Sequence, residues 1–293
     1  MNLMIVLTAT SACATDVDLG FVQLDWFKIV VLGIVQGITE LLPISSTAHL
    51  RIVPSLLGWP DPGSAFSAAM QLASLIAVLT YFWDDLRRIS GGIVRSLIKG
   101  DTKSRSSQLG LGILLGTVPI LIAGLLLKKT LNACNSPLRG LAVIGAASIV
   151  MSLLLMAAEI WGKRDRPFEK ITLKDGLWIG VAQAFALVPG VSRSGSTLTA
   201  GLALGLERET AARFSFLLGL PAVVLAGAVE IHTLLKAGLD PHGWMVLLIG
   251  LISASISAFV AIYSLLRYLE RHSTWIFIWY RLVMGAFLIF KSL

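Results

Sequence analysis

Long apolar stretches dominate the chain and are separated by short polar or charged segments. A helix needs about 20 apolar residues to cross roughly 30 Å of hydrocarbon. Six stretches approach this length: 66–83, 109–127, 141–160, 212–229, 244–266 and 275–290. The pattern therefore predicts six transmembrane helices.

Two further apolar regions, 27–57 and 177–206, are interrupted instead of continuous. Pro43 breaks the first, Pro189 and Gly190 break the second, and both contain Ser, Thr and charged residues. Backbone outside a helix is tolerated at membrane depth only where protein buries it or water reaches it. We expect each region to form a re-entrant helix pair that turns back inside the protein.

The two interrupted regions resemble each other. GIVQ at 33–36 recurs about 147 residues later as GVAQ at 180–183, and each is followed by a proline and a Ser/Thr cluster. FSAAMQLASL at 66–75 and FSFLLGLPAV at 214–223 match at nearly the same offset. These matches indicate an internal duplication.

The duplication predicts how the chain is organised. If each copy is a re-entrant pair followed by three spans, an odd number of crossings separates the copies, so they insert in opposite orientation. We predict one membrane domain, 25–293, with an inverted repeat at about 25–160 and 176–293. The two interrupted elements should meet near the bilayer midplane. Residues 1–24 are interpreted as a tail, because the apolar part is short and no Lys or Arg precedes it as in a signal peptide.

Composition and charge agree with a membrane protein. Only 14% of the residues are charged, against about a quarter in soluble domains. The net charge is +7, and Lys and Arg cluster in two expected loops, 84–108 and 162–175, which the positive-inside rule places in the cytoplasm. The first re-entrant helix pair then enters the membrane from outside and the second from inside, and together they form a pocket open to the periplasmic face. Nothing in this distribution indicates nucleic-acid binding, and Glu159, at a span end, is expected to meet water.

Both interrupted regions contain hydroxyl-rich motifs. The first reads QGITELLPISSTAH at 36–49 and the second PGVSRSGST at 189–197. After Pro43 a helix can restart with Ser45 or Ser46 as its N-cap. Its free backbone N–H groups and positive dipole end would then face a phosphate.

Charged and titratable residues stand beside these hydroxyls. Ser46 and His49 share one helical face, as do Gln36 and Glu40. Arg193 lies in the second motif, where a membrane-embedded guanidinium indicates function and suits a pair of phosphate oxygens. A nucleophile, an acid/base, a carboxylate and a cationic clamp are the parts of phosphoryl transfer.

Two other classes of protein stay open at this point. Inverted repeats with paired half-helices are typical of transporters, so the protein could move an anionic lipid phosphate. Ser with His is also the acyl-transfer pair of an intramembrane serine protease. A pure transporter has no need of Ser46 beside His49, and Arg193 favours a phosphate over a peptide carbonyl.

The two motifs resemble the signature motifs of the undecaprenyl-diphosphate phosphatases, the bacitracin-resistance family of the bacterial inner membrane. The similarity covers nearly the whole chain from about residue 25. The resemblance implies hydrolysis of undecaprenyl diphosphate to undecaprenyl phosphate and inorganic phosphate, which recycles the carrier lipid for cell-wall synthesis. The implied partners are the polyprenyl diphosphate and the bilayer, and a homodimer stays open.

Roles follow from the resemblance residue by residue. Ser46 would be the nucleophile and His49 its acid/base partner, while Arg193 would bind the diphosphate. Glu40 would serve in catalysis or hold a divalent cation. The other positions implied to line the pocket are Ser45, Thr47, Ser192, Ser194 and Thr197.

Gln36 departs from the family pattern, because a second glutamate is common at this position. We expect it to contact the substrate as a neutral group. With one carboxylate left, Glu40, a metal held by protein groups alone is short of ligands. We therefore expect Mg²⁺ or Ca²⁺ to take most of its oxygens from water and substrate phosphates.

Overall fold

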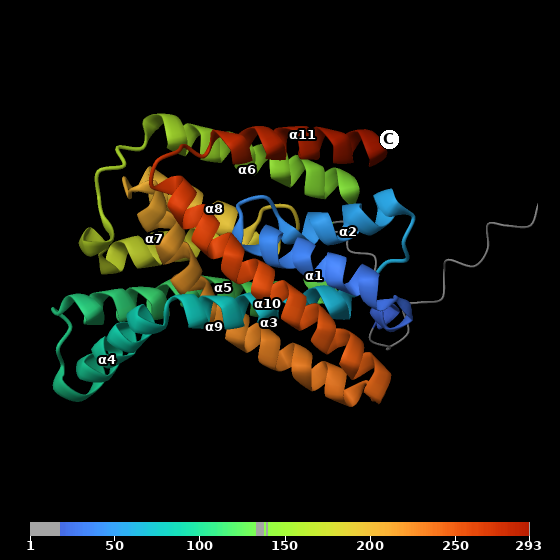
Figure 1. The fold of residues 1–293 in the computed structure, drawn as a ribbon. Coiled ribbons are helices and arrows are strands. Elements are labelled where there is room, and N and C mark those ends of the chain that lie inside the picture. The colour runs from blue at the N-terminus through green and yellow to red at the C-terminus, as the bar shows by residue number, and fades with distance from the viewer. Residues whose placement is uncertain (1–17, 133–137, 139, 293) are drawn as a thin grey trace, which may run out of the picture.

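The computed structural model describes residues 18–132, 138 and 140–292, without the side chains of 128–132. Within these ranges the chain is helical, apart from an isolated bridge between Arg166 and Leu206 (Figure 1). The α-helices are α1 (Trp26–Leu41), α2 (Ser46–Leu57), α3 (Ser64–Tyr81), α4 (Trp83–Lys99), α5 (Arg105–Asn132), α6 (Leu141–Trp161), α7 (Leu173–Ala184), α8 (Arg193–Ala203), α9 (Arg208–Lys236), α10 (Pro241–Leu269) and α11 (Trp275–Ser292). Short 3-10 helices are η1 (Gly20–Gln23), η3 (Phe168–Lys170) and η4 (Phe185–Leu187).

Among the described residues, six helices are long and apolar enough to cross a membrane: α3, α5, α6, α9, α10 and α11. Each overlaps one of the six predicted stretches. Large apolar side chains are exposed on them, such as Leu125 at 76% and Phe290 at 77%. Apolar surface on this scale is not tolerated in water, so these faces meet lipid. The prediction of an all-α, multi-pass membrane protein is confirmed.

Both interrupted regions form pairs of short helices. In the first, α1 and α2 are separated by residues 42–45, and in the second, η4 and residues 188–192 separate α7 from α8. Pro43 and Pro189 lie in the breaks, because proline lacks the N–H that would continue a helix and clashes with the preceding turn. The two helix pairs are present, whereas their re-entrant course in a bilayer stays a prediction.

The first helix of each pair packs closely on a long helix. A Cβ on Gly37 of α1 would lie 2.3 Å from the Ala254 carbonyl oxygen of α10. A Cβ on Gly180 of α7 would lie 2.1 Å from the Gly116 carbonyl oxygen of α5. Small residues let membrane helices approach until their backbones touch. The pairs α1/α10 and α7/α5 are therefore built in the same way.

The charged segment 84–108 was predicted to be a loop, and this was wrong for most of its length. It forms α4 and the start of α5. Ile89 is buried, and Gly92 packs so tightly on α5 that a Cβ would lie 2.3 Å from the Ser106 carbonyl carbon. The high charge content concealed apolar residues at helical spacing, which pack on one side.

Glu159 was expected to meet water, and this was also wrong. It is only 3% exposed and accepts hydrogen bonds from Arg164 Nη1 at 2.9 Å and Thr274 Oγ1 at 2.8 Å. Arg208 from α9 also pairs with it through Nε at 3.0 Å. The ends of α6, α9 and α11 converge around this carboxylate, and a buried charge persists because it is paired.

The segment before α1 is described only from residue 18. Phe21 of η1 is fully buried, with its ring centroid 5.6 Å from that of Phe66 on α3. The end of the predicted tail 1–24 therefore packs on the helices, and residues 1–17 lie outside the described part of the chain.

Candidate active site

The two helix breaks meet inside the molecule. Ser194 Oγ, in the first turn of α8 just after the second break, donates to the Leu42 carbonyl of the first break at 2.9 Å. Arg281 of α11, which is 1% exposed, joins them from a third side. Its Nη1 donates to the Pro43 carbonyl at 2.9 Å and its Nη2 to the Val191 carbonyl at 3.0 Å. The residues of both predicted motifs are thereby brought together.

Glu40, at the end of α1, is the centre of the polar contacts. The Ser46 hydroxyl donates to Oε2 at 2.5 Å, and Gln36 Nε2 donates to the same oxygen at 3.0 Å. Arg193 Nη2, from the other motif, donates to Oε1 at 3.2 Å. One buried carboxylate therefore holds the hydroxyl, an amide and the guanidinium at a single point.

The α2 helix begins without a side-chain cap. Ser45 is its N-cap residue, as the motif suggested, with φ 73°. Its buried Oγ has no hydrogen-bond partner among the described residues. A non-glycine residue at positive φ is strained, and such residues cluster at functional sites. The first-turn N–H groups of α2, which include those of Ser46 and Thr47, are available to an anion.

The polar residues of the second motif hold backbone. Ser192, with φ 70°, caps α8 by accepting from the Gly195 N–H at 3.2 Å. Thr197 donates to the Arg193 carbonyl at 2.7 Å and contacts Ser215. Together with Ser194, these predicted pocket residues fasten the break and α8.

His49 does not partner Ser46 here. Its Nδ1 lies 2.7 Å from the Ser45 carbonyl oxygen, and its Nε2 lies 2.6 Å from the Tyr280 hydroxyl of α11. Its ring stacks on Tyr280, with centroids 5.6 Å apart and planes at 10°. The structure thus pairs Ser46 with Glu40, and His49 with α11.

A cavity of about 350 Å³, lined by both polar and apolar residues, adjoins this arrangement. Its wall includes three predicted residues, Gln36, Ser46 and Thr47, and also Arg51 and Gln71. Leu138, Ile144 and the connection at 186–189 contribute the apolar part of the wall. The Ser46 hydroxyl and the start of α2 therefore border a space large enough for a diphosphate.

The family follows from comparison with known proteins. A family model described as bacitracin resistance protein BacA matches residues 29–287. The chain belongs to this BacA family. The match covers both motifs and runs from within α1 to within α11, with every helix between them.

Named relatives of this BacA family chain come from several bacteria. An undecaprenyl-diphosphatase 2 of Mesorhizobium japonicum is 59% identical over 87% of this chain and 96% of its own. Undecaprenyl-diphosphatases of Trichormus variabilis and Synechococcus elongatus are 55% and 56% identical, over 94% and 90% of this chain and 86% and 92% of theirs. Their names describe an enzyme that acts on a polyprenyl diphosphate.

The donor groups of this BacA family chain limit how it could bind a metal ion. No group of three or more His, Cys, Asp or Glu in the described ranges could hold a metal ion. Buried Gln36 Oε1, however, has no donor among the described residues, and it belongs to the amide that contacts Glu40. An orphaned oxygen beside a carboxylate fits a hard cation that takes its other ligands from water and phosphates.

Two site residues of this BacA family chain escaped the sequence analysis. Arg281 lies inside a predicted span. A charged residue at membrane depth indicates function, and this applies to Arg281 as it does to Arg193. Tyr280 gave no such signal, because tyrosine is ordinary in membrane helices. Only the packing of α11 against the two breaks reveals what these residues contact.

Proposed function

We propose that the protein hydrolyses undecaprenyl diphosphate to undecaprenyl phosphate and inorganic phosphate. The main support is the Glu40 carboxylate, which holds a hydroxyl and a guanidinium together beside a cavity in a multi-pass membrane protein. The names of relatives that are 51% to 59% identical agree with this activity. The reaction would recycle the carrier lipid for cell-wall synthesis and oppose bacitracin.

In the proposed first step the Ser46 oxygen attacks the distal phosphorus. Glu40 accepts the hydroxyl proton along the 2.5 Å hydrogen bond. The bond from phosphorus to the bridging oxygen breaks, and undecaprenyl phosphate leaves with that oxygen. Water then attacks the phosphoserine, which releases inorganic phosphate and restores the Ser46 hydroxyl.

Charge stabilisation in this scheme comes from Arg193 and the start of α2. The guanidinium of Arg193, which is bonded to Glu40 through Nη2 and packed against Gly219, would bring a positive charge to the phosphate oxygens. The uncapped N–H groups of α2, near Thr47, add the positive dipole end. These donors are in place before substrate arrives, so they require no reorganisation in the transition state.

His49 keeps an acid/base role in the proposal, directed at a phosphate oxygen or a water. Glu40 already serves Ser46. His49 stands one turn further along α2, where it can exchange a proton with the leaving phosphate side.

A divalent cation, Mg²⁺ or Ca²⁺, is proposed to accompany the diphosphate. Glu40 and Gln36 Oε1 would supply its protein ligands, with phosphates and water completing the set. When bound, the cation would neutralise phosphate charge.

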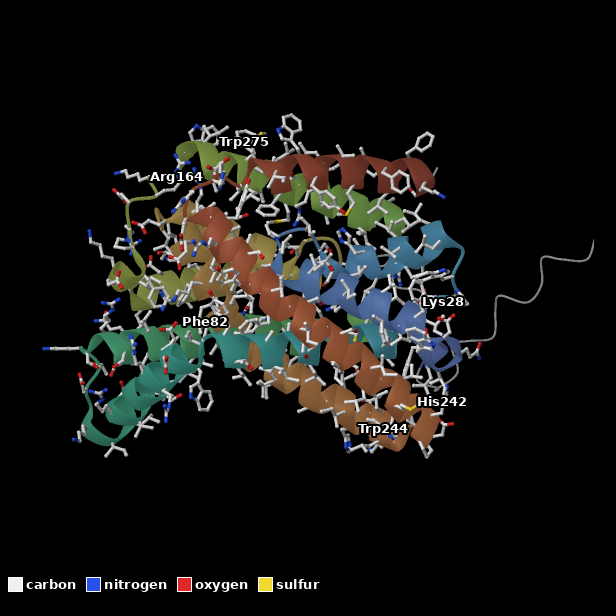
Figure 2. The ribbon with its side chains drawn as sticks, in the orientation of Figure 1. Lys28, Phe82, Arg164, His242, Trp244 and Trp275 are labelled. Atoms are coloured by element: carbon white, nitrogen blue, oxygen red, sulfur yellow. The ribbon has the colours of Figure 1, made fainter. Side chains whose placement is uncertain are left out.

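The inverted repeat and a site open to the periplasmic face complete the proposal, in the bacterial inner membrane. Ser45 and Ser192, about 147 residues apart, share positive φ at equivalent places, which supports the repeat. Figure 2 shows Arg164 and Phe82 at one end of the molecule and Lys28 at the other, which supports placing the charged segments 84–108 and 162–175 on the same side of the membrane.

Membrane sidedness can be tested with cysteine labelling. In a background without Cys13 and Cys134, we expect Lys236→Cys to react with a membrane-impermeant thiol reagent on intact cells. Thr102→Cys should react only after permeabilisation. The reverse pattern would contradict the orientation.

The activity is tested by phosphate release from a polyprenyl diphosphate in detergent, with Mg²⁺ or chelator. We expect Ser46→Ala, Glu40→Gln and Arg193→Ala each to lose activity by a hundredfold or more, about 3 kcal/mol of transition-state stabilisation. Leu125→Ala, on a lipid-facing surface, is the control. Folded wild-type protein that releases no phosphate would reject the proposal and favour lipid transport.

A further inference from the structure

The contacts of His49 determine its tautomer. Nδ1 faces the Ser45 carbonyl oxygen at 2.7 Å, and a carbonyl has no proton to give, so Nδ1 carries the hydrogen and donates. In the neutral ring the lone pair is then on Nε2. The Tyr280 hydroxyl, 2.6 Å from Nε2, is therefore the donor. Tyr280 faces the basic nitrogen of His49.

The ring contact adds a second constraint. The His49 and Tyr280 rings are stacked, with planes at 10°. Tyr280 is 45% exposed, whereas His49 is 7% exposed. A tyrosine that anchors a membrane helix points its hydroxyl toward the headgroups, but this hydroxyl points to a buried imidazole. Its orientation matches a specific contact between α11 and α2.

The neighbouring residue holds Tyr280 in place. Arg281 is buried and donates to the Pro43 carbonyl of the first break and the Gly190 carbonyl of the second. The backbone at Tyr280 is thereby tied to both breaks. A side chain supported in this way keeps its partner within the narrow tolerance that catalysis requires.

A second stacked pair shows what an ordinary contact of this kind looks like. Tyr268 and His272 stack with centroids 4.6 Å apart, but they lie four residues apart at an exposed segment end. Their contact links no separate elements. Tyr280 and His49 come from helices far apart in the chain.

We propose that Tyr280 is a positioning residue for His49, and that its hydroxyl and ring hold the imidazole in the Nδ1–H tautomer. The inference rests on the proposed function for its catalytic consequence. The contact itself can be tested without activity.

The kinetic test is a double-mutant cycle with Tyr280→Phe, which keeps the ring and removes the hydroxyl. We expect kcat for phosphate release to fall roughly 10- to 100-fold with KM unchanged, part of the ~10²–10⁴ typical of acid–base catalysis. In a His49→Ala background Tyr280→Phe should have no further effect, because it acts only through His49. Independent, multiplying losses, or wild-type kcat in Tyr280→Phe, would overturn the proposal.

The structural test is nitrogen NMR of ¹⁵N-histidine-labelled protein. The chain has 4 histidines, and loss of signals in His49→Ala assigns the ring. We expect a protonated Nδ1 in wild type and an Nε2 resonance that shifts in Tyr280→Phe but not in Tyr268→Phe. An unshifted Nε2 resonance would overturn the contact. Inactive wild type with the expected shift would instead reject the proposed function and leave the contact standing.

Discussion

The two helix breaks have matching serines that are used differently. Ser45 and Ser192 each precede a short helix, with φ 73° and 70°. Ser192 Oγ accepts the Gly195 N–H and closes the start of α8. Ser45 Oγ has no partner among the described residues, and no described side chain caps α2.

The difference indicates that the second break has a structural role, whereas the first break takes part in binding and reaction. A capped helix start has used its donors, whereas an uncapped start beside a cavity offers them to an anion. Ser46 and Thr47, which directly follow the first break, line the cavity. The second contributes Arg193 and fastens itself to the first through Ser194. Two similar backbones thus supply different parts of one site.

The largest expected effect comes from removing the residue that joins the breaks. Arg281→Met leaves the Pro43, Gly190 and Val191 carbonyls without their donor. We expect a loss of about 3 kcal/mol or more in unfolding free energy, because buried acceptors are left unpaired. Thermal unfolding in detergent measures it, with exposed Arg271→Met as the control. Equal melting of the two variants would show that the breaks hold together without Arg281.

The contribution of the second break to the first can be tested through Gly219 on α9. A Cβ there would lie 2.1 Å from Arg193 Nη1, so Gly219→Ala should push the guanidinium off Glu40. We expect kcat/KM to fall roughly tenfold to a hundredfold, as small misplacements do, with little change in melting temperature. Gly124→Ala is the control, since no described atom lies within 4 Å of its Cβ position. Unchanged kcat/KM would mean that the Arg193 position is not critical.

The difference in capping predicts that the same substitution changes the stability of the protein at one serine but not at the other. Ser192→Ala should lower the unfolding free energy by about 1 kcal/mol, because the α8 cap is lost. Ser45→Ala removes a hydroxyl with no described partner and should leave stability nearly unchanged. Chemical denaturation of both variants provides the comparison. Equal losses would remove the distinction between the breaks.

The smallest effect concerns the start of α7, which leads into the second break. Burial alone would raise the pKa of Asp175, but hydrogen bonds from Arg166 and Thr172 outweigh it and hold this pKa below its usual range. The ionised Asp175 carboxylate therefore stabilises the folded state fully at pH values above its unfolded-state pKa of about 4. This stabilisation is lost as the pH falls through the lower folded-state pKa. Melting temperatures from pH 7 to 3 should decline less steeply in Asp175→Asn. Parallel curves would assign the acid sensitivity elsewhere.

The sequence alone determined the membrane class, the six spans and the two breaks. Hydropathy, proline positions and charged residues within spans are local properties, so they can be read before any helix is packed. The same local logic singled out Glu40, Ser46 and Arg193. It failed at α4 and Glu159, where charge suggested water and packing produced burial.

Only the tertiary structure determined which side chains are hydrogen-bonded to one another. Helical spacing places Ser46 and His49 on one face, but it does not say that they touch. The His49 ring bonds back to the Ser45 carbonyl and across to Tyr280, while Ser46 bonds to Glu40. Contacts such as these join residues that are distant in the chain or separated by a break. They depend on how helices pack, which no local pattern in the sequence specifies.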